Sequence, residues 1–229
     1  MIQNVDGAIV LAQHFKDKLL KYGFRNRILL TTTKVDDAFF GNYDVIKDRD
    51  YDKKNILFLA RIVNTKGIYE TVDTYALLKS KYKELTLTIV GDGPELDTLK
   101  KYVESKGLQD ICFRGRLEGE SIANEYKTAN YFLFPSYGEG MPAVVLEAMA
   151  FGLPVFTRKV GGLVDFFEDG KMGYITDSLD PKDFAEAMIP YLNDNELARK
   201  VSLHNAQYAK KNFMASQVAK ELEHFLKTI

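Results

Sequence analysis

The chain has 229 residues, which is enough for one large domain with a substantial hydrophobic core. Its 31 Lys and Arg residues nearly balance its 32 Asp and Glu residues, so no overall positive field favours nucleic acid as a partner. A single cysteine excludes an internal disulfide, and the apolar setting of Cys112 in ICFRG predicts a buried, unreactive thiol. Three histidines far apart in the sequence, without a cysteine pair, argue against a metal site built by the protein.

The sequence shows no long apolar segment that could span a membrane. Its first residues, MIQNVDGAIV, lack the basic start of a signal peptide. A cytoplasmic location is therefore expected.

Residues 1–48 differ in pattern from the rest of the chain. A strand at 7–12, a helix at 13–24 and a strand at 27–32 are predicted there. Two strands and one helix cannot enclose a core of their own. Residues 1–48 are therefore predicted to be a remnant of a preceding domain together with its link to the main one.

From residue 49 onward, short apolar runs alternate with longer amphipathic segments, and Gly, Pro or Asp lies at most of the junctions. This alternation is typical of parallel βαβ units, and several runs are apolar throughout, as strands covered on both faces are. The predicted strands are 55–60, 85–91, 111–115, 131–136, 154–158 and 174–176. The predicted helices are 67–81, 94–106, 118–129, 142–151, 162–168, 181–193 and two more up to the C terminus. The pattern predicts an α/β fold, with a doubly wound, Rossmann-like parallel sheet over residues 49–212 and a C-terminal helix over 213–229.

Sheets of this kind bind ligands beyond the carboxyl ends of their strands, so function is expected in the strand-to-helix loops. The loop LARIVNTKG, residues 59–67, brings Arg61 and Lys66 to a helix N-terminus. Unpaired amides at such an end already favour an anion, and a diphosphate suits two added cations. A surface loop that carries two basic side chains without a ligand would look the same.

The next loop, VGDGPELDTL at residues 90–99, contains Gly91, Gly93 and Pro94. These residues suit a tight turn followed by a helix, which explains the loop almost entirely. The glycine fingerprint of dinucleotide binding is absent, because Leu96 stands where its third glycine belongs. A dinucleotide dehydrogenase is therefore disfavoured.

The stretch GEGMPAVVLEAM, residues 138–149, contains two glutamates with seven residues between them. Pro142 is expected to begin a helix whose first amides point into the crevice. Glu147 lies deep in that helix, among residues that leave hardly any polar face, so a simple surface role is disfavoured. Because carboxylates accept hydrogen bonds from vicinal hydroxyls, Glu139 and Glu147 are candidate contacts for a ribose or a hexose.

A fourth loop, TRKVGGLVDFF at residues 157–167, places Gly161 and Gly162 before a further predicted helix. Adjacent glycines suit a phosphate lying against bare backbone, and they suit a plain turn equally well. The four loops together predict a pocket for a phosphate-bearing, hydroxyl-rich ligand.

These residues resemble the donor-binding, C-terminal half of the family 4 (group 1) retaining glycosyltransferases, which have the two-domain GT-B fold. The resemblance runs in order from about residue 55 to residue 212 and is carried by FLARIVNTKG, TIVGDGPELDTL, CFRGRL and YFLFPSYGEGMPAVVLEAM. The glutamate pair is its most specific motif.

The resemblance implies a role for each matching residue. Arg61 and Lys66 would hold the donor diphosphate in place of a divalent metal, so no metal and no other cofactor is expected. Glu139 would be the catalytic residue that contacts the transferred sugar, and Glu147 would bind the ribose hydroxyls. The remaining candidates would line the sugar and phosphates (Gly140, Met141, Pro142, Ala143, Val144) or read the nucleobase (Arg116, Leu117).

The resemblance implies transfer of a sugar, with retention, from a UDP-, GDP- or ADP-sugar to a saccharide or lipid-linked acceptor, as in polysaccharide biosynthesis. Most of the family's N-terminal acceptor domain is missing, so the chain alone is expected to bind the donor and to transfer little or nothing. Peripheral contact with the cytoplasmic face of a membrane is expected only through that missing half. Two alternatives stay open: a nucleotide-sugar-binding or regulatory module without transfer activity, and a GT-B type sugar-nucleotide epimerase.

Overall fold

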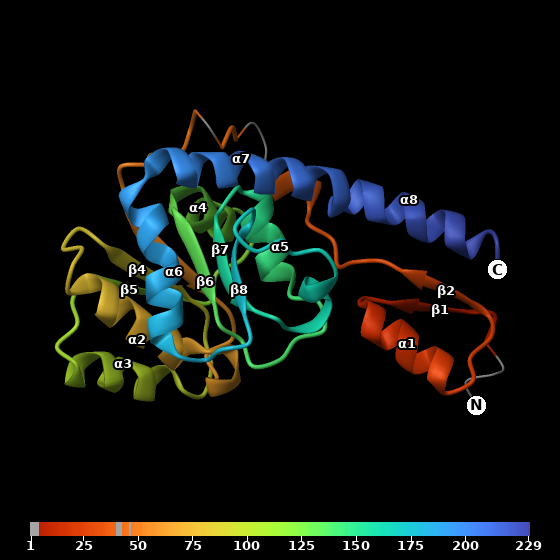
Figure 1. Cartoon of the computed structure of the whole chain (residues 1–229), viewed down its shortest axis with the longest axis horizontal. Helices are drawn as coiled ribbons and strands as arrows, with labels where there is room; N and C mark the ends of the chain where they lie inside the picture. The colour runs from red at the N-terminus through yellow and green to blue at the C-terminus, as the bar shows by residue number, and fades with distance from the viewer. Residues whose placement is uncertain (1–4, 40–42, 46) are drawn as a thin grey trace.

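The computed structural model describes residues 5–39, 43–45 and 47–229, which form a small N-terminal unit beside a larger domain (Figure 1). The unit consists of β1 (Gly7–Val10), α1 (Gln13–Lys21) and β2 (Arg27–Leu30), and its two strands pair in parallel. No residue of α1 is buried, so this unit builds no core around its helix. The three elements predicted for 1–48 are confirmed, whereas residues 1–4, 40–42 and 46 of that segment lie outside the described residues.

The larger domain is built on a six-stranded sheet in which every pairing is parallel. Its strands are β3 (Asn55–Leu59), β4 (Thr86–Val90), β5 (Ile111–Gly115), β6 (Tyr131–Phe134), β7 (Val155–Arg158) and β8 (Gly173–Thr176). The spatial order is β5-β4-β3-β6-β7-β8, which confirms the predicted doubly wound α/β fold. The chain runs outward from β3 in one direction and from β6 in the other, so the topological switch point lies between these two strands.

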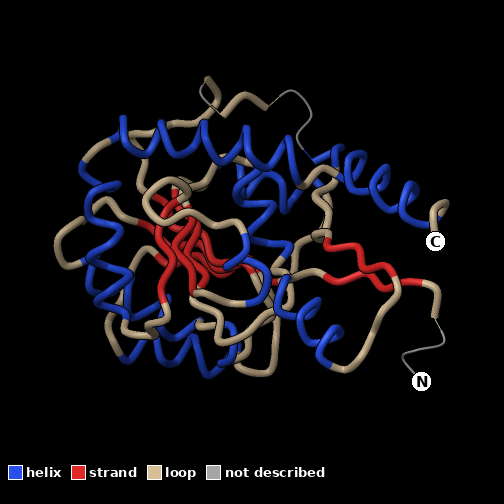
Figure 2. Tube along the Cα trace, turned by 45° about the vertical axis from the view of Figure 1, so that its right-hand side comes forward, coloured by secondary structure: helices blue, strands red, loops and turns tan. Residues whose placement is uncertain are grey.

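Helices cover both faces of this sheet (Figures 1 and 2). On one face, α2 (Ile68–Lys79) packs against α6 (Pro181–Asn193) and also contacts α3 (Leu96–Ser105). On the other face lie α4 (Glu120–Thr128) and α5 (Ala143–Ala150), and α7 (Asn195–Asn212) packs on α5. All four residues of β6 are buried as a result, which explains why its sequence is apolar without alternation.

The last helix, α8 (Ala215–Leu226), extends from the end of α7 toward the N-terminal unit (Figure 1). At its far end, the Arg27 guanidinium donates a hydrogen bond of 2.6 Å to the Thr228 carbonyl. Nearer the main domain, Val35 forms a parallel bridge with Met214. The two ends of the described chain are thus held together along one side of the molecule.

Two predicted helices differ from the structure. Residues 162–168 form no α-helix, because Gly161 has a φ of +56° and the chain makes only a short 3-10 turn, η4 (Gly161–Asp165). The helix expected from residue 94 begins at Leu96. Its preceding residue, Glu95, is tied instead to the neighbouring loop, where its Oε1 accepts a hydrogen bond from the Asn64 amide at 3.1 Å.

Cys112 is exposed, so the prediction of a buried thiol is wrong. It lies on β5, the edge strand of the sheet, where burial alternates along the strand instead of covering both faces. Cys112 and Arg114 share the exposed face of this strand. An apolar neighbourhood in the sequence therefore did not imply burial at the edge.

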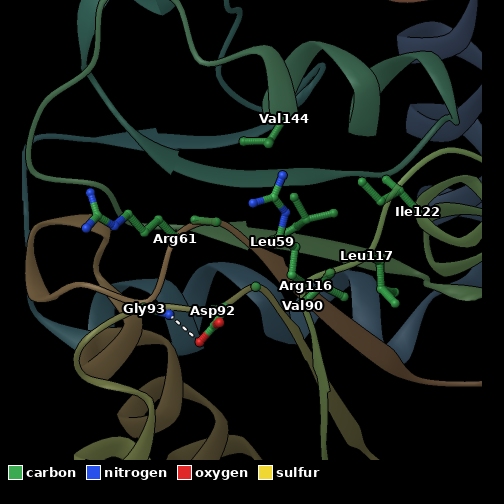
Figure 3. Close-up of a pocket in the computed structure, with 11 residues that line it drawn as sticks. Leu59, Arg61, Val90, Asp92, Gly93, Arg116, Leu117, Ile122 and Val144 are labelled. Carbon is green, nitrogen blue, oxygen red and sulfur yellow. Dashed lines mark hydrogen bonds between the residues drawn. The ribbon is translucent and has the colours of Figure 1, made fainter.

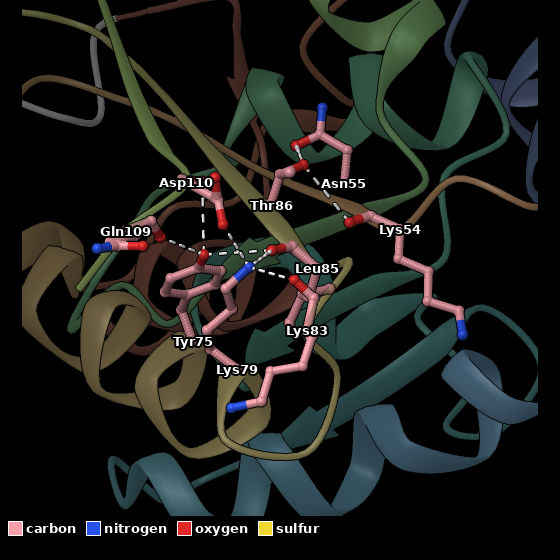
Figure 4. Close-up of polar contacts among 9 residues, drawn as sticks. All are labelled: Lys54, Asn55, Tyr75, Lys79, Lys83, Leu85, Thr86, Gln109 and Asp110. Carbon is pink, nitrogen blue, oxygen red and sulfur yellow. Dashed lines mark hydrogen bonds and ion pairs between the residues drawn. The ribbon is translucent and has the colours of Figure 1, made fainter.

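A polar cluster fastens α2 to the amino-terminal ends of β4 and β5 (Figure 4). Lys79 Nζ donates to the carbonyls of Lys83 at 2.6 Å and Leu85 at 2.8 Å, and it pairs with Asp110 at 2.7 Å. The Tyr75 hydroxyl donates to the carbonyl of Gln109 at 2.6 Å. This cluster lies at the opposite end of the strands from the strand-to-helix loops.

Candidate functional site

The loops that follow β3 and β6 cross each other at the switch point. A Cβ atom on Gly67 would lie 2.2 Å from the Pro135 carbonyl oxygen, and the φ of Gly67 is +75°, so both sterics and conformation require glycine. Next to this crossing, the Tyr137 amide donates to the Thr65 carbonyl at 2.9 Å. Backbone contact therefore fixes the relative position of the two loops that carry the predicted site residues.

Lys66 and Glu139 form an ion pair across this crossing. The Lys66 Nζ lies 2.6 Å from Glu139 Oε1, although 73 positions separate the two residues in the sequence. The Ser136 hydroxyl donates to the same Oε1 at 2.6 Å. The Glu139 side chain is 12% exposed, whereas the Lys66 side chain is 29% exposed. The carboxylate is therefore mostly covered by protein, and the lysine is partly accessible to solvent.

Glu147 lies on the second turn of α5, and its polar partner is a buried tyrosine. The Tyr126 hydroxyl, at the end of α4, lies 2.9 Å from Glu147 Oε2. Burial raises the pKa of Glu147, and the hydrogen bond from Tyr126 opposes that rise with a smaller effect. The carboxylate in this apolar helix is thus neither on the surface nor without a donor.

A pocket of about 550 Å³ lies beside these loops, at the carboxyl ends of β3 and β4 (Figure 3). Its volume is in the range of small-molecule sites. Leu117, Ile122 and Val144 give it an apolar wall, while its charged lining consists of two cations and one carboxylate (Arg61, Arg116 and Asp92). The combination suits a ligand with a flat apolar part and an anionic part.

The predicted site residues fall into two adjoining groups. Arg61, Arg116, Leu117 and Val144 line the pocket, whereas Lys66 is paired with Glu139 outside its lining. The other predicted residues continue from Glu139 into α5, where Pro142 takes the N-cap position and Ala143, not Pro142, begins the helix. Gly140 and Met141 form the connection between these two groups.

The glycine pair at 161 and 162 packs against Gly140. The Gly162 amide donates to the Gly140 carbonyl at 2.8 Å, and a Cβ on Gly161 would lie 2.1 Å from that oxygen. A Cβ on Gly162 would lie 2.2 Å from the Met141 side chain. Of the two sequence interpretations, the structure therefore supports a turn whose function is to hold the loop at residues 138–141.

Sequence reasoning missed two polar residues of this site. Ser136 lies two residues after the end of β6, is completely buried and donates to Glu139. Tyr126 lies on the apolar face of α4, where a tyrosine is normally interpreted as core. A carboxylate buried in an apolar helix needs a hydrogen-bond donor. The hydroxyl groups of Ser136 and Tyr126 were the only signal in the sequence that either residue could supply one.

Within the described ranges, no group of three or more His, Cys, Asp or Glu side chains is placed to hold a metal ion. The same part of the chain contains no helix that is both long and apolar enough to cross a membrane. Positive charge at the site comes from side chains, among them Arg61 and Lys66.

Comparison with known proteins identifies the family. The family described as glycosyl transferases group 1 matches residues 41–210. The chain belongs to this family. Capsular polysaccharide biosynthesis glycosyltransferase CapM of Staphylococcus aureus is 27% identical to it over 230 residues, an alignment that covers 95% of this chain and 57% of CapM.

Two solved structures show the same fold as this group 1 glycosyltransferase chain. The pneumococcal O-GlcNAc transferase GtfA, in complex with UDP and GlcNAc, has a TM-score of 0.83 at 20% identity, over 98% of this chain and 45% of GtfA. Anabaena HepE, in complex with UDP and glucose, has a TM-score of 0.83 at 19% identity, over 98% of this chain and 64% of HepE. The fold is that of the C-terminal domain of GT-B glycosyltransferases. The chain spans 56% and 57% of the length of two curated relatives, one of them CapM.

Proposed function

We propose that this chain is the donor-binding domain of a retaining glycosyltransferase, which transfers a sugar from a nucleotide diphosphate sugar to a saccharide or lipid-linked acceptor. The observation that carries the proposal is the Lys66–Glu139 pair, because it lies at the topological switch point and adjoins a pocket of ligand size. The UDP and sugars bound to GtfA and HepE support a nucleotide-sugar as the ligand class. The name of CapM supports a saccharide product.

In the proposed complex, the two groups of residues contact different parts of the nucleotide-sugar. The nucleobase lies in the pocket near the backbone of Arg116 and Leu117, and the ribose hydroxyls bind Glu147. The diphosphate lies by Arg61 and Lys66 and at the start of α5, where the first amides of a helix have no intrahelical acceptor. Glu139, already held by two donors, faces the transferred sugar.

In the proposed reaction, the bond between the anomeric carbon and the diphosphate oxygen breaks, and negative charge grows on the leaving group. Arg61, Lys66 and the α5 amides stabilise that charge, which is the role a divalent metal has in other enzymes, and we propose that none is needed here. The carboxylate of Glu139 stabilises the positive charge that develops at the sugar ring. The acceptor oxygen then bonds to the anomeric carbon on the face that the diphosphate leaves, and the hydroxyl proton passes to the departing diphosphate.

We further propose that transfer requires an acceptor-binding half that these 229 residues do not supply. Support comes from the N-terminal unit, whose helix buries no residue, and from the share of its relatives that the chain spans. Acceptor positioning and exclusion of water both need a second wall over the site. Efficient transfer by residues 1–229 alone would contradict this part of the proposal.

Calorimetric titration with UDP, GDP and ADP, and with their sugar conjugates, tests the donor site. One nucleotide should bind the wild-type chain, and Glu147→Ala should weaken it strongly. Glu104→Ala, which removes an exposed glutamate from α3, is the matched control and should bind as the wild type does. If no nucleotide or nucleotide-sugar binds the wild-type chain, the proposed function is wrong.

A further inference from the structure

We propose that Tyr126 is a positioning residue for the nucleotide, because its hydroxyl holds the Glu147 carboxylate in the orientation that receives the ribose. The inference rests on the proposed function and adds a residue from α4 to it. Tyr126 is fully buried, so in the proposed complex it acts on the ligand only through Glu147. It lies 21 positions before Glu147 in the sequence, and the packing of α4 beside α5 brings the two side chains together.

The geometry gives the Tyr126 hydroxyl one preferred acceptor. Its oxygen lies 2.9 Å from Glu147 Oε2 and 3.2 Å from the Val144 carbonyl oxygen. A phenol has one proton to donate, and a carboxylate is a stronger acceptor than a peptide carbonyl. Oε2 of Glu147 is therefore occupied from inside the protein, which leaves Oε1 to accept from the ribose in the proposed complex.

The tyrosine ring has little freedom to move. It stacks on Phe151 with a centroid distance of 5.2 Å and an interplanar angle of 10°, and it lies 6.1 Å from the Phe132 ring. The Phe151 carbonyl in turn accepts a hydrogen bond of 2.6 Å from the buried guanidinium of Arg49. A ring fixed in this way sets the position of its hydroxyl, and hence the rotamer of Glu147, before any ligand arrives.

The same contact determines the pH range in which Glu147 can accept a hydrogen bond from a diol. Burial raises the pKa of Glu147, and the hydrogen bond from the Tyr126 hydroxyl lowers it. Binding that needs the carboxylate is present above this pKa and is lost as the pH falls through it. Removal of the hydroxyl raises the pKa further, so the loss should then begin at a higher pH.

The test uses Tyr126→Phe, which keeps the stacked ring and removes only the hydroxyl. Titrations at several pH values compare the diphosphate that binds best among UDP, GDP and ADP with its 2′,3′-dideoxy analogue. At neutral pH we expect affinity for the ribonucleotide to fall about tenfold, which is the size of one hydrogen bond to a charged group. Affinity for the dideoxy analogue should change less than twofold. The acid limb of ribonucleotide binding, which is the pH range in which affinity falls on acidification, should move to higher pH.

Tyr131→Phe is the matched control. Its hydroxyl donates to the Tyr191 carbonyl at 2.9 Å in the same core, on the opposite face of β6 from Tyr126, and its loss should leave nucleotide affinity unchanged. Equal weakening by both variants would overturn the proposal, because it would indicate a general loss of packing. Equal weakening of ribonucleotide and dideoxy analogue would do the same.

Replacement of Tyr126 by 3-fluorotyrosine provides a second measurement if Tyr126→Phe does not fold. The fluorinated phenol is a stronger donor, so the acid limb should move to lower pH, and an unmoved limb would overturn the proposal. Failure of this inference is distinct from failure of the proposed function. A wild-type chain that binds no nucleotide overturns both, whereas a wild-type chain that binds, with a Tyr126→Phe variant that binds equally well at every pH, overturns only the role of Tyr126.

Discussion

Replacement of Lys66 by alanine should weaken the binding of a nucleoside diphosphate without changing the binding of the nucleoside. Two unit charges 4 Å apart attract each other by about 4 kcal/mol at the effective dielectric constant near a protein surface. The net loss is smaller, because Lys66 is 29% exposed and is already paired with Glu139 in the free protein. We expect a loss of about 1.5 to 2.5 kcal/mol, or roughly 10- to 70-fold in Kd.

Calorimetry with UDP, GDP or ADP, whichever binds best, measures this loss, and a nuclear magnetic resonance titration measures binding of the matching nucleoside. Lys54→Ala is the matched control, since Lys54 is 18% exposed and pairs with Glu84 at 2.9 Å before the start of β3, away from the site. It should leave both affinities unchanged. The reasoning is refuted if Lys66→Ala binds the diphosphate as tightly as the wild type, or if it loses affinity for the nucleoside to the same extent.

Three further predictions concern stability and accessibility. Gly67→Ala should lower the free energy of unfolding in urea by roughly 2 to 4 kcal/mol, because its Cβ would lie 2.2 Å from the Pro135 oxygen. Gly107→Ala is the control, since Gly107 has a positive φ but no atom within 4 Å of the added Cβ, and it should cost only about 1 kcal/mol. Equal losses of stability in the two variants would contradict the close contact of the two loops. Lys79→Ala should lower stability by about 1 to 3 kcal/mol and leave nucleotide affinity within twofold, and a loss of affinity would show that the ends of the sheet are coupled. Cys112 should react with a disulfide reagent in the native protein without loss of nucleotide binding; a thiol that reacts only after unfolding would contradict its exposure.

The strands could be predicted because their signal is local. Each run from β3 to β8 is bounded by turn residues and has the composition of a strand, and the alternation with helical segments indicates parallel connections. The edge position of β5 was not available from the same pattern. Whether Cys112 is covered depends on which strand lies at the end of the sheet, and the sequence of ICFRG carries no information on its neighbours.

The candidate site was predicted in its components and not in its contacts. The strand-to-helix loops could be located from the sequence because the carboxyl ends of parallel strands share one edge. The pairing of Lys66 with Glu139 was not foreseen, since each residue was assigned to a different part of the ligand. The roles of these residues toward a donor stay predictions until binding is measured.

The sequence alone determined the alternating α/β order, the six strands, the loops and the two glutamates of the GEGMPAVVLEAM stretch, because periodicity, turn residues and motif spacing are properties of neighbours along the chain. Only the tertiary structure decided what each glutamate contacts. Glu139 lies against Lys66 because β3 and β6 are parallel neighbours, so the loops that follow them leave the sheet at the same edge. Glu147 lies against Tyr126 because side chains of α4 and α5 are in contact. A buried charge selects its partner by distance in space, and sequence separation has no fixed relation to that distance.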